Sequence, residues 1–226
     1  MRTQIRLLIG GLSLFAVVAS AYAGGWAIVT VNDFPDYAVA GKTLGVSFTV
    51  RQHGVTLLSG LKPVVLAKTP DHRELKLAVS PTQHEGEYRF DLPLLQPGEW
   101  KITIDSGFIL YLTGKAATLE DSPKAASAGY VTLSLGVIPA DSSQPAISER
   151  ERGERLFSAK GCTGCHGTGI GPELTGKHLS AEYLKQLLAD PAGTLKLQGK
   201  AQVGQMPNLN LKTGEIAALS KFLAGR

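Results

Sequence analysis

The hydrophobic pattern of this chain changes its period near residue 140. Between Trp26 and about Ile138, apolar and polar residues alternate one by one, as they do along strands that bury a single face. The clearest alternating segments are residues 46–50, 88–92 and 100–104. Turns rich in glycine and proline separate such segments and leave room for about seven short strands. We therefore predict an all-β, immunoglobulin-like sandwich over residues 24–138.

The next segment, residues 139–147, contains two prolines, an aspartate and two serines. It has little apolar surface to bury, so we predict a linker. Beyond it the apolar residues recur with the helical period, which predicts an all-α domain over residues 148–226. Ser148 followed three residues later by Glu151 is a capping-box signal, and the first helix should run from there towards Gly161.

Two further helices are predicted in this domain. One should run from an N-cap at Ser180 to Asp190, where Pro191 is expected to stop it. The other should begin near Thr213 and end before Gly225, with an apolar stripe along one side. Three helices joined by long glycine-rich connections would make a poorly filled bundle by themselves. We therefore expect a large bound group in the middle of this domain.

The first 23 residues have the features of a secretory signal peptide. Arginines precede an apolar run over residues 7–20, and Ala21 and Ala23 are small residues at the −3 and −1 positions of a cleavage site before Gly24. This run of 14 residues is shorter than the roughly 18 to 20 that span a bilayer, and retention as an anchor is the alternative. No later segment is long and apolar enough to cross a membrane. The mature chain is therefore expected to be periplasmic or otherwise exported, without a membrane span.

Composition and charge narrow the classes of function. With 43% hydrophobic and 19% charged residues, the chain is typical of globular proteins. Its formal net charge is +4, and two of the positive charges, Arg2 and Arg6, belong to the predicted signal peptide. The remaining excess is too small to suggest nucleic-acid binding. Only two cysteines are present, which excludes a scaffold of several disulfides.

Both cysteines belong to the pentapeptide Cys162-Thr163-Gly164-Cys165-His166. Two thiols separated by two residues can form thioether bonds with both vinyl groups of one haem, and the adjacent histidine is then held under the iron as its proximal ligand. The motif therefore predicts one covalently attached haem c, with Cys162 and Cys165 as attachment sites and His166 as an axial ligand. Covalent attachment also explains how a small domain retains a large cofactor.

Three other interpretations of this motif fit the sequence less well. A structural zinc site needs four ligands, and the remaining histidines are dispersed without a second paired spacing. A thioredoxin-like dithiol would follow a strand, whereas a helical pattern precedes this motif. A plain disulfide is compatible with an exported protein, but it leaves His166 and the glycine-rich sequence after it unexplained.

The iron of such a haem has a sixth position to fill. Met206 is the only methionine after the predicted signal peptide, and Pro207 stiffens the chain where the thioether must point at the iron. A lone methionine is more often a gap filler in a core, but after the CTGCH motif we interpret Met206 as the distal ligand. His178 is the rival ligand, although it follows Lys177 near a helix entry, where a solvated histidine is the ordinary interpretation.

Residues 148–226 resemble a class I cytochrome c in its small bacterial form. The matching positions are the CTGCH motif, the segment Gly169–Leu174 and the pair Met206–Pro207. The resemblance implies that the carbonyl of Pro172 accepts a hydrogen bond from the imidazole of His166, which fixes the ring and increases its basicity. It also implies that the first and last helices cross through a glycine and an aromatic contact. The fitting residues in this chain are Gly153, Phe157 and Phe222.

Residues 24–140 have a weaker resemblance to exported FixH-like or YtkA-like sandwich domains. It depends on the segment Gly86–Phe90 followed by Pro97–Ile102. Some such domains are associated with oxidase assembly or copper handling, but no ligand set carries over to this chain. His53, His72 and His84 are the only conceivable soft ligands in the region, and Cu(I) normally draws on sulfur. Turn positions are the ordinary interpretation of these three histidines.

Together these features predict a c-type cytochrome that transfers single electrons in a respiratory or related chain. It would be an electron-transfer protein and not an enzyme by itself, with a place as a subunit of an oxidoreductase as the alternative. Its partners would be a redox donor and a redox acceptor. Residues 148–226 carry a net charge of +4 and residues 24–147 a net charge of −2. We therefore expect an acidic partner protein to dock on residues 148–226. The alternative is that these basic side chains are only solvated and steer no partner. The lysines expected to steer such a partner are Lys160, Lys177, Lys200 and Lys212.

Two alternatives from other functional classes stay open at this point. In the first, the sandwich is the active part of the protein: it binds copper or a partner during oxidase assembly, and the haem is a sensor or redox helper. The other alternative is an enzyme whose iron becomes accessible when Met206 leaves. Nothing else in the chain resembles a peroxidase distal pocket, and Met206 argues against an open site.

Overall fold

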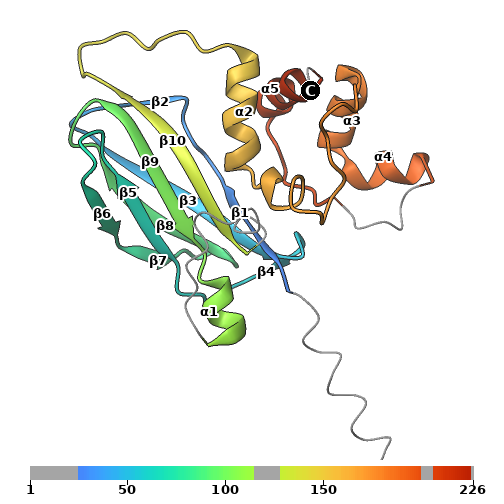
Figure 1. The fold of residues 1–226 in the computed structure, drawn as a ribbon, viewed down its shortest axis with the longest axis horizontal. Coiled ribbons are helices and arrows are strands. Elements are labelled where there is room, and N and C mark those ends of the chain that lie inside the picture. Colours follow the sequence, from blue (N-terminus) through green and yellow to red (C-terminus); the bar gives the residue numbers. More distant parts are fainter. Residues whose placement is uncertain (1–24, 115–127, 200–205, 225–226) are drawn as a thin grey trace, which may run out of the picture.

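The computed structural model describes residues 25–114, 128–199 and 206–224. Figure 1 shows a β-rich N-terminal region and a helical C-terminal region lying side by side. The predicted signal peptide, residues 1–23, lies outside the described residues. No helix within the described ranges is long and apolar enough to cross a membrane.

The β-rich region contains two sheets that share one hydrophobic core. The first sheet has the strand order β1 (Ala27–Val31), β3 (Thr43–Gln52), β8 (Glu87–Pro93) and β7 (Val79–Pro81), and β4 (Thr56–Leu57) also pairs with β3. The second has the order β2 (Tyr37–Val39), β10 (Tyr130–Ile138), β9 (Gly98–Asp105), β5 (Val64–Lys68) and β6 (Glu74–Leu77). The pair β2 and β10 is parallel, and the other pairs are antiparallel.

The alternation of apolar and polar residues in the sequence matches the alternation of buried and exposed side chains along these strands. Alternate residues of β8 and β9 point into the core, so that Phe90 and Trp100 are at most 2% exposed. Within the described residues, β2, β4 and β7 contain only two or three residues each. Such short strands give no periodic signal, which is why the sequence predicted about seven strands rather than ten.

The helical region contains α2 (Glu149–Ala159), the 3-10 turn η2 (Cys162–Gly164), α3 (Ala181–Ala189), α4 (Pro191–Leu197) and α5 (Thr213–Leu223). A short helix in the β-rich region, α1 (Phe108–Thr113), was not predicted, because six residues are too few to show a helical period. The three predicted helices are present as α2, α3 and α5. The helical prediction is therefore confirmed for its main elements.

Two details of the helix termini differ from the prediction. α3 ends before Pro191 as expected, but the same proline begins α4, because the first position of a helix needs no N–H donor. Asp190 Oδ1 caps α4 by accepting a hydrogen bond from the N–H of Gly193 at 3.0 Å. At α2, the predicted capping box is only half formed. Ser148 Oγ accepts from the N–H of Glu151 at 3.2 Å, whereas the carboxylate of Glu151 pairs with Arg155 at 2.8 Å.

The crossing of α2 and α5 is confirmed at the residues that the resemblance implied. The rings of Phe157 and Phe222 lie 5.7 Å apart at an interplanar angle of 58°. Gly153 faces α5 so closely that a Cβ atom there would lie 2.1 Å from the carbonyl oxygen of Ala218. Only glycine permits this approach, because any side chain would separate the helix backbones.

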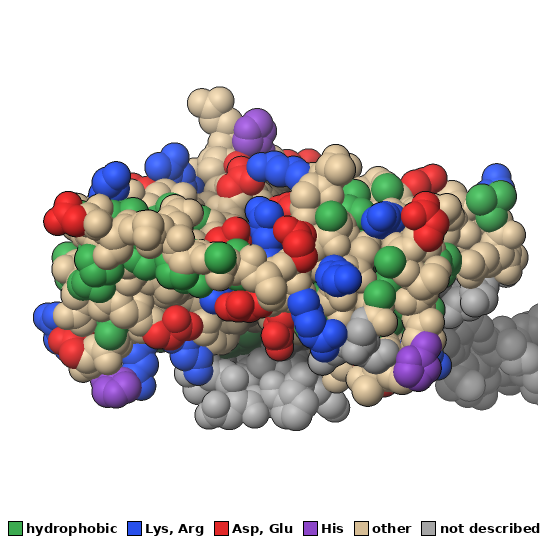
Figure 2. All heavy atoms as spheres, turned by 90° about the horizontal axis from the view of Figure 1, so that it is seen from above, with side chains coloured by type: hydrophobic (Ala, Val, Ile, Leu, Met, Phe, Trp, Pro, Cys, Tyr) green, Lys and Arg blue, Asp and Glu red, His purple; other side chains and the backbone are tan. Residues whose placement is uncertain are grey.

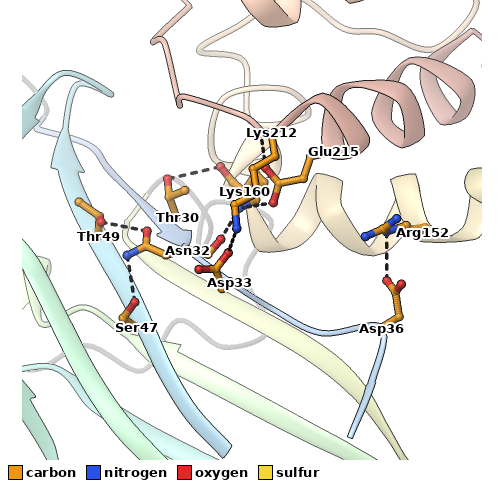
Figure 3. A network of polar contacts seen from close by, with 10 residues as sticks. All are labelled: Thr30, Asn32, Asp33, Asp36, Ser47, Thr49, Arg152, Lys160, Lys212 and Glu215. Atoms are coloured by element: carbon orange, nitrogen blue, oxygen red, sulfur yellow. Dashed lines mark hydrogen bonds and ion pairs between the residues drawn. The ribbon is translucent and has the colours of Figure 1, made fainter. Parts of the chain in front are cut away.

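The two regions contact each other through α2, which packs against β10 and β1. Arg155 Nη1 donates to the carbonyl oxygen of Asp36 at 2.8 Å, and its guanidinium lies 5.3 Å from the ring centre of Tyr37. Arg152 pairs with the carboxylate of Asp36 at 3.3 Å, as Figure 3 shows. The segment between β1 and β2 is therefore held against the polar side of α2.

Replacement of Gly153 by alanine should destabilise the protein by about 1–3 kcal/mol, because the added methyl group forces the crossing helices apart. Gly214→Ala is the matched control, since a Cβ atom at Gly214 meets nothing within 4 Å. Its stability should be unchanged or slightly higher. Denaturant unfolding followed by circular dichroism measures both variants, and equal midpoints would show that the helix crossing does not require glycine.

Candidate functional site

The CTGCH motif begins where α2 ends. Gly161 has a φ of 75°, which turns the chain out of the helix and into η2. The N–H groups of Cys165 and His166 both donate to the carbonyl oxygen of Cys162, at 3.2 Å and 2.9 Å. This single turn gives Cys162, Cys165 and His166 the i, i+3, i+4 spacing that brings side chains to one side of a helical turn.

The ring of His166 is fixed by the segment that follows the motif. Its Nδ1 lies 2.9 Å from the carbonyl oxygen of Pro172, the contact that the cytochrome c resemblance implied. Because a carbonyl only accepts, Nδ1 carries the proton and Nε2 is the ring nitrogen with a free lone pair. The N–H of Gly171 donates to the carbonyl of Cys165 at 2.9 Å, and a Cβ atom at Gly171 would lie 3.2 Å from His166 Nδ1. Glycine at this position leaves room for the imidazole.

A cavity of about 320 Å³ brings the candidate residues together. Cys162, Cys165, His166 and Pro172 line it from one segment, and Met206 lines it from another. Its lining is mostly apolar, with Ile28, Val55, Ile170 and Leu209 among its side chains. The structure therefore collects an imidazole, a thioether and two thiols around one apolar space.

His178, the rival of Met206, is placed elsewhere. It is exposed, has a positive φ of 48°, and is not among the residues that line the cavity. Met206 is half-buried and packs against the core of the helical region. Of the two candidates, Met206 is thus the one that shares a cavity with His166.

The surroundings of the two cysteines disfavour their thiolate forms. Both are free thiols, and burial raises the pKa of Cys162 to about 12 and that of Cys165 to about 11. Zinc binding and nucleophilic disulfide exchange both use the thiolate, which these surroundings disfavour. Among the described residues, no group of three or more His, Cys, Asp or Glu side chains is arranged to hold a metal ion.

The positions of three histidines bear on the alternative that the β-rich region binds copper. His53 follows β3, His72 lies between β5 and β6, and His84 precedes β8, so the three histidines occupy different turns. His53 and His72 both have positive φ, of 51° and 66°. The arrangement agrees with turn positions and gives the copper alternative no support.

The prediction that Lys160 steers an acidic partner is wrong. Lys160 is only 4% exposed: its Nζ pairs with Glu215 at 2.8 Å and donates to the carbonyl oxygen of Asn32 at 2.6 Å. Lys212 pairs with Asp33, and Figure 3 shows both ammonium groups directed at the segment after β1. This contact lowers the pKa of Asp33 and raises that of Lys212. Lys160 therefore serves contacts within the chain, because the β-rich region covers it. Lys212 is 69% exposed despite its pair with Asp33, and its part in steering stays a prediction.

The remaining two lysines of that prediction have different positions. Lys177 is exposed, and Lys200 lies outside the described residues. Figure 2 shows acidic and basic side chains interspersed over the face seen from above rather than gathered by sign. Of the four lysines, only Lys160 is thus excluded from steering, and steering by the others stays a prediction.

Part of the cavity is lined by residues of the β-rich region that the sequence does not indicate. Trp26, Ile28, His53 and Val55 line the same space as the cysteines and Met206. Their sequence signals are those of ordinary strand and turn residues. No local pattern could identify them, because their place at the cavity depends on how the sheet packs against the helical region.

Residues 148–223 match a family model described as cytochrome C oxidase, cbb3-type, subunit III. This match supports a cytochrome c segment in this part of the chain, and it covers about a third of the 226 residues. Such a segment implies haem binding and electron transfer with redox partners. No curated protein matches the chain.

Three solved structures illustrate the similarity of this chain to known folds. The Lin-41 filamin domain is 11% identical, with a TM-score of 0.36 over 50% of this chain and 91% of that one. Salmonella alpha-2-macroglobulin reacted with methylamine is 15% identical, with a TM-score of 0.36 over 55% and 7%. Domains 4 and 5 of the S-layer protein SbsC are 15% identical, with a TM-score of 0.32 over 49% and 44%. These three TM-scores are below 0.5, so the similarities indicate neither the fold nor the function of this chain.

Replacement of Lys160 by methionine should lower the free energy of unfolding by about 3–5 kcal/mol, because it leaves the carboxylate of Glu215 without its buried partner. The side chains of this pair are 5% and 12% exposed. Lys212→Met is the control, since its pair with Asp33 is 69% and 75% exposed and should barely move the unfolding midpoint. Urea unfolding compares the two variants, and similar midpoints would contradict a structural role for Lys160.

Proposed function

We propose that this protein is an exported c-type cytochrome that transfers single electrons through one haem. The haem would be attached to Cys162 and Cys165 and ligated by His166 and Met206. The observation that supports this most directly is that all four residues, from two separate segments, line one apolar cavity. The cytochrome c match over residues 148–223 supports the same cofactor.

Each residue has a distinct task in this proposal. When bound, haem supplies an iron that accepts and releases one electron. The carbonyl of Pro172 holds the imidazole of His166 by the 2.9 Å contact to Nδ1, which directs Nε2 to the ligand role and increases its basicity. Met206 offers a neutral, soft thioether, which favours the reduced state more than a second imidazole would. With His166 and Met206 both holding the iron, a substrate would have no access to it, and little would need to move during electron transfer.

The organisation of the chain follows from this role. We infer a signal peptide over residues 1–23, an immunoglobulin-like sandwich over 24–138, a linker over 139–147 and the cytochrome domain over 148–226. The last sheet strand ends at Ile138 and α2 begins at Glu149, which supports these boundaries. The signal pattern and the cytochrome c segment both support a periplasmic or otherwise exported location. Donor and acceptor would be other redox proteins of a respiratory or related chain.

Replacement of Met206 by alanine should remove the weak ferric absorption band near the red end of the spectrum that reports a sulfur–iron bond. It should also lower the reduction potential, because the soft ligand that favours ferrous iron is lost. His178→Ala is the matched control and should leave the band in place. Optical spectra of protein made with haem-attachment machinery test this. A band that survives in Met206→Ala would show that another residue is the distal ligand.

A further inference from the structure

The cavity has a wall that the cytochrome c segment does not supply. Trp26, Ile28, His53 and Val55, here called the sheet tip, come from the β-rich region and lie outside residues 148–223. We propose that the sheet tip contacts the haem and closes one side of its site, so that the two regions of the chain share the cofactor. This inference rests on the proposed function, because it requires a haem in the cavity.

The sheet tip is held in one arrangement by local contacts. The chain reverses between β3 and β4 through His53 and Gly54, whose φ angles are 51° and 72°. The N–H of His53 donates to the carbonyl oxygen of Trp26 at 3.0 Å, and their rings lie 5.6 Å apart. The N–H of Val55 donates to the carbonyl of Gln52 at 3.1 Å. The turn and the start of β1 are thereby joined into one surface.

This surface approaches the cytochrome segment beside two of the residues that would hold the haem. A Cβ atom at Gly161, which precedes Cys162, would lie 3.6 Å from Cβ of Ile28 in the sheet tip and 2.5 Å from the carbonyl oxygen of the adjacent Val29. A Cβ atom at Gly54 would lie 3.1 Å from Cγ of Pro207, which follows Met206. The sheet tip therefore spans from the attachment motif to the distal ligand. A cofactor bound between those positions has the sheet tip along its edge.

Two exposed apolar side chains line the cavity, one from each region. Val55 is 66% exposed and Ile170 is 40% exposed, although both line the cavity, one from each region. An exposed valine in a turn is ordinary by itself. Two such residues that line one cavity, one from each region, are side chains that a flat, apolar cofactor would cover.

A charge placed on the sheet tip should then change the equilibrium between ferrous and ferric protein. Val55→Asp should favour the ferric state and Val55→Lys the ferrous state, because the reduced site carries one positive charge less. The expected change is about fivefold in the ferrous-to-ferric ratio in each direction, or about 40 mV at 59 mV per tenfold for one electron. Since Val55 is already exposed, either side chain can reach water without disturbing the fold.

Leu95 provides the matched control. It is 58% exposed, and the adjacent Leu94 is held to the carbonyl of Lys42, just before β3 begins. Val55 lies past the other end of β3, whose ten residues span about 30 Å. A charge at Leu95 is thus several screening lengths of roughly 8–10 Å from the sheet tip. Leu95→Asp and Leu95→Lys should leave the potential unchanged.

Redox titration of the full chain and its four variants, at low and high salt, decides between the outcomes. Opposite shifts at Val55 with none at Leu95 support the sheet tip as a wall of the haem site. Potentials at Val55 that move no more than those at Leu95, in proteins with a normal haem spectrum, would overturn this inference and leave the proposed function intact. Absence of covalent haem from the unmodified protein would overturn both, and the spectrum recorded before titration separates the two failures.

Discussion

The buried ammonium of Lys160 fixes the arrangement on which the site depends. It pairs with Glu215 at the start of α5 and with the carbonyl of Asn32 at the end of β1, while the Lys160 carbonyl accepts from Thr30 at 3.4 Å. One residue thus joins the β-rich region, the last helix and the chain immediately before Cys162. A buried ion pair adds little net stability, because its charges must leave water. It selects one arrangement, since any displacement of the two regions would leave a buried charge unpaired.

The consequence for the cavity is that its walls cannot move independently. Glu215 also accepts from the N–H of Lys212 at 2.9 Å, so the cap of α5 and the partner of Lys160 are the same carboxylate. α5 in turn contacts α2 through the Gly153 crossing, and α2 leads into the CTGCH motif. Rigid placement suits a site whose task is electron transfer, because a ligand set that stays in place requires little rearrangement when the charge changes.

The parts of the fold and site that could be predicted from sequence are those fixed by neighbours along the chain. The spacing of Cys162, Cys165 and His166 is local, and so are the alternation in β8 and β9 and the stripe of α5. The contact of His166 with Pro172 was reached through the resemblance to cytochrome c, since six residues of loop have no periodic signal. The position of Trp26 and His53 at the cavity was not predictable, because it depends on the packing of two regions. The role of Lys160 was missed for the same reason: a charge is visible in a sequence, but its burial is not.

The central claim is that an exported chain carries one haem bound covalently through Cys162 and Cys165. Intact mass spectrometry of the denatured protein, purified from cells with haem-attachment machinery, tests it most directly. The account predicts the mass of the chain from Gly24 onward plus one haem, retained after denaturation. The mass of that chain without haem, or of that chain lacking two hydrogen atoms because the cysteines form a disulfide, would contradict it.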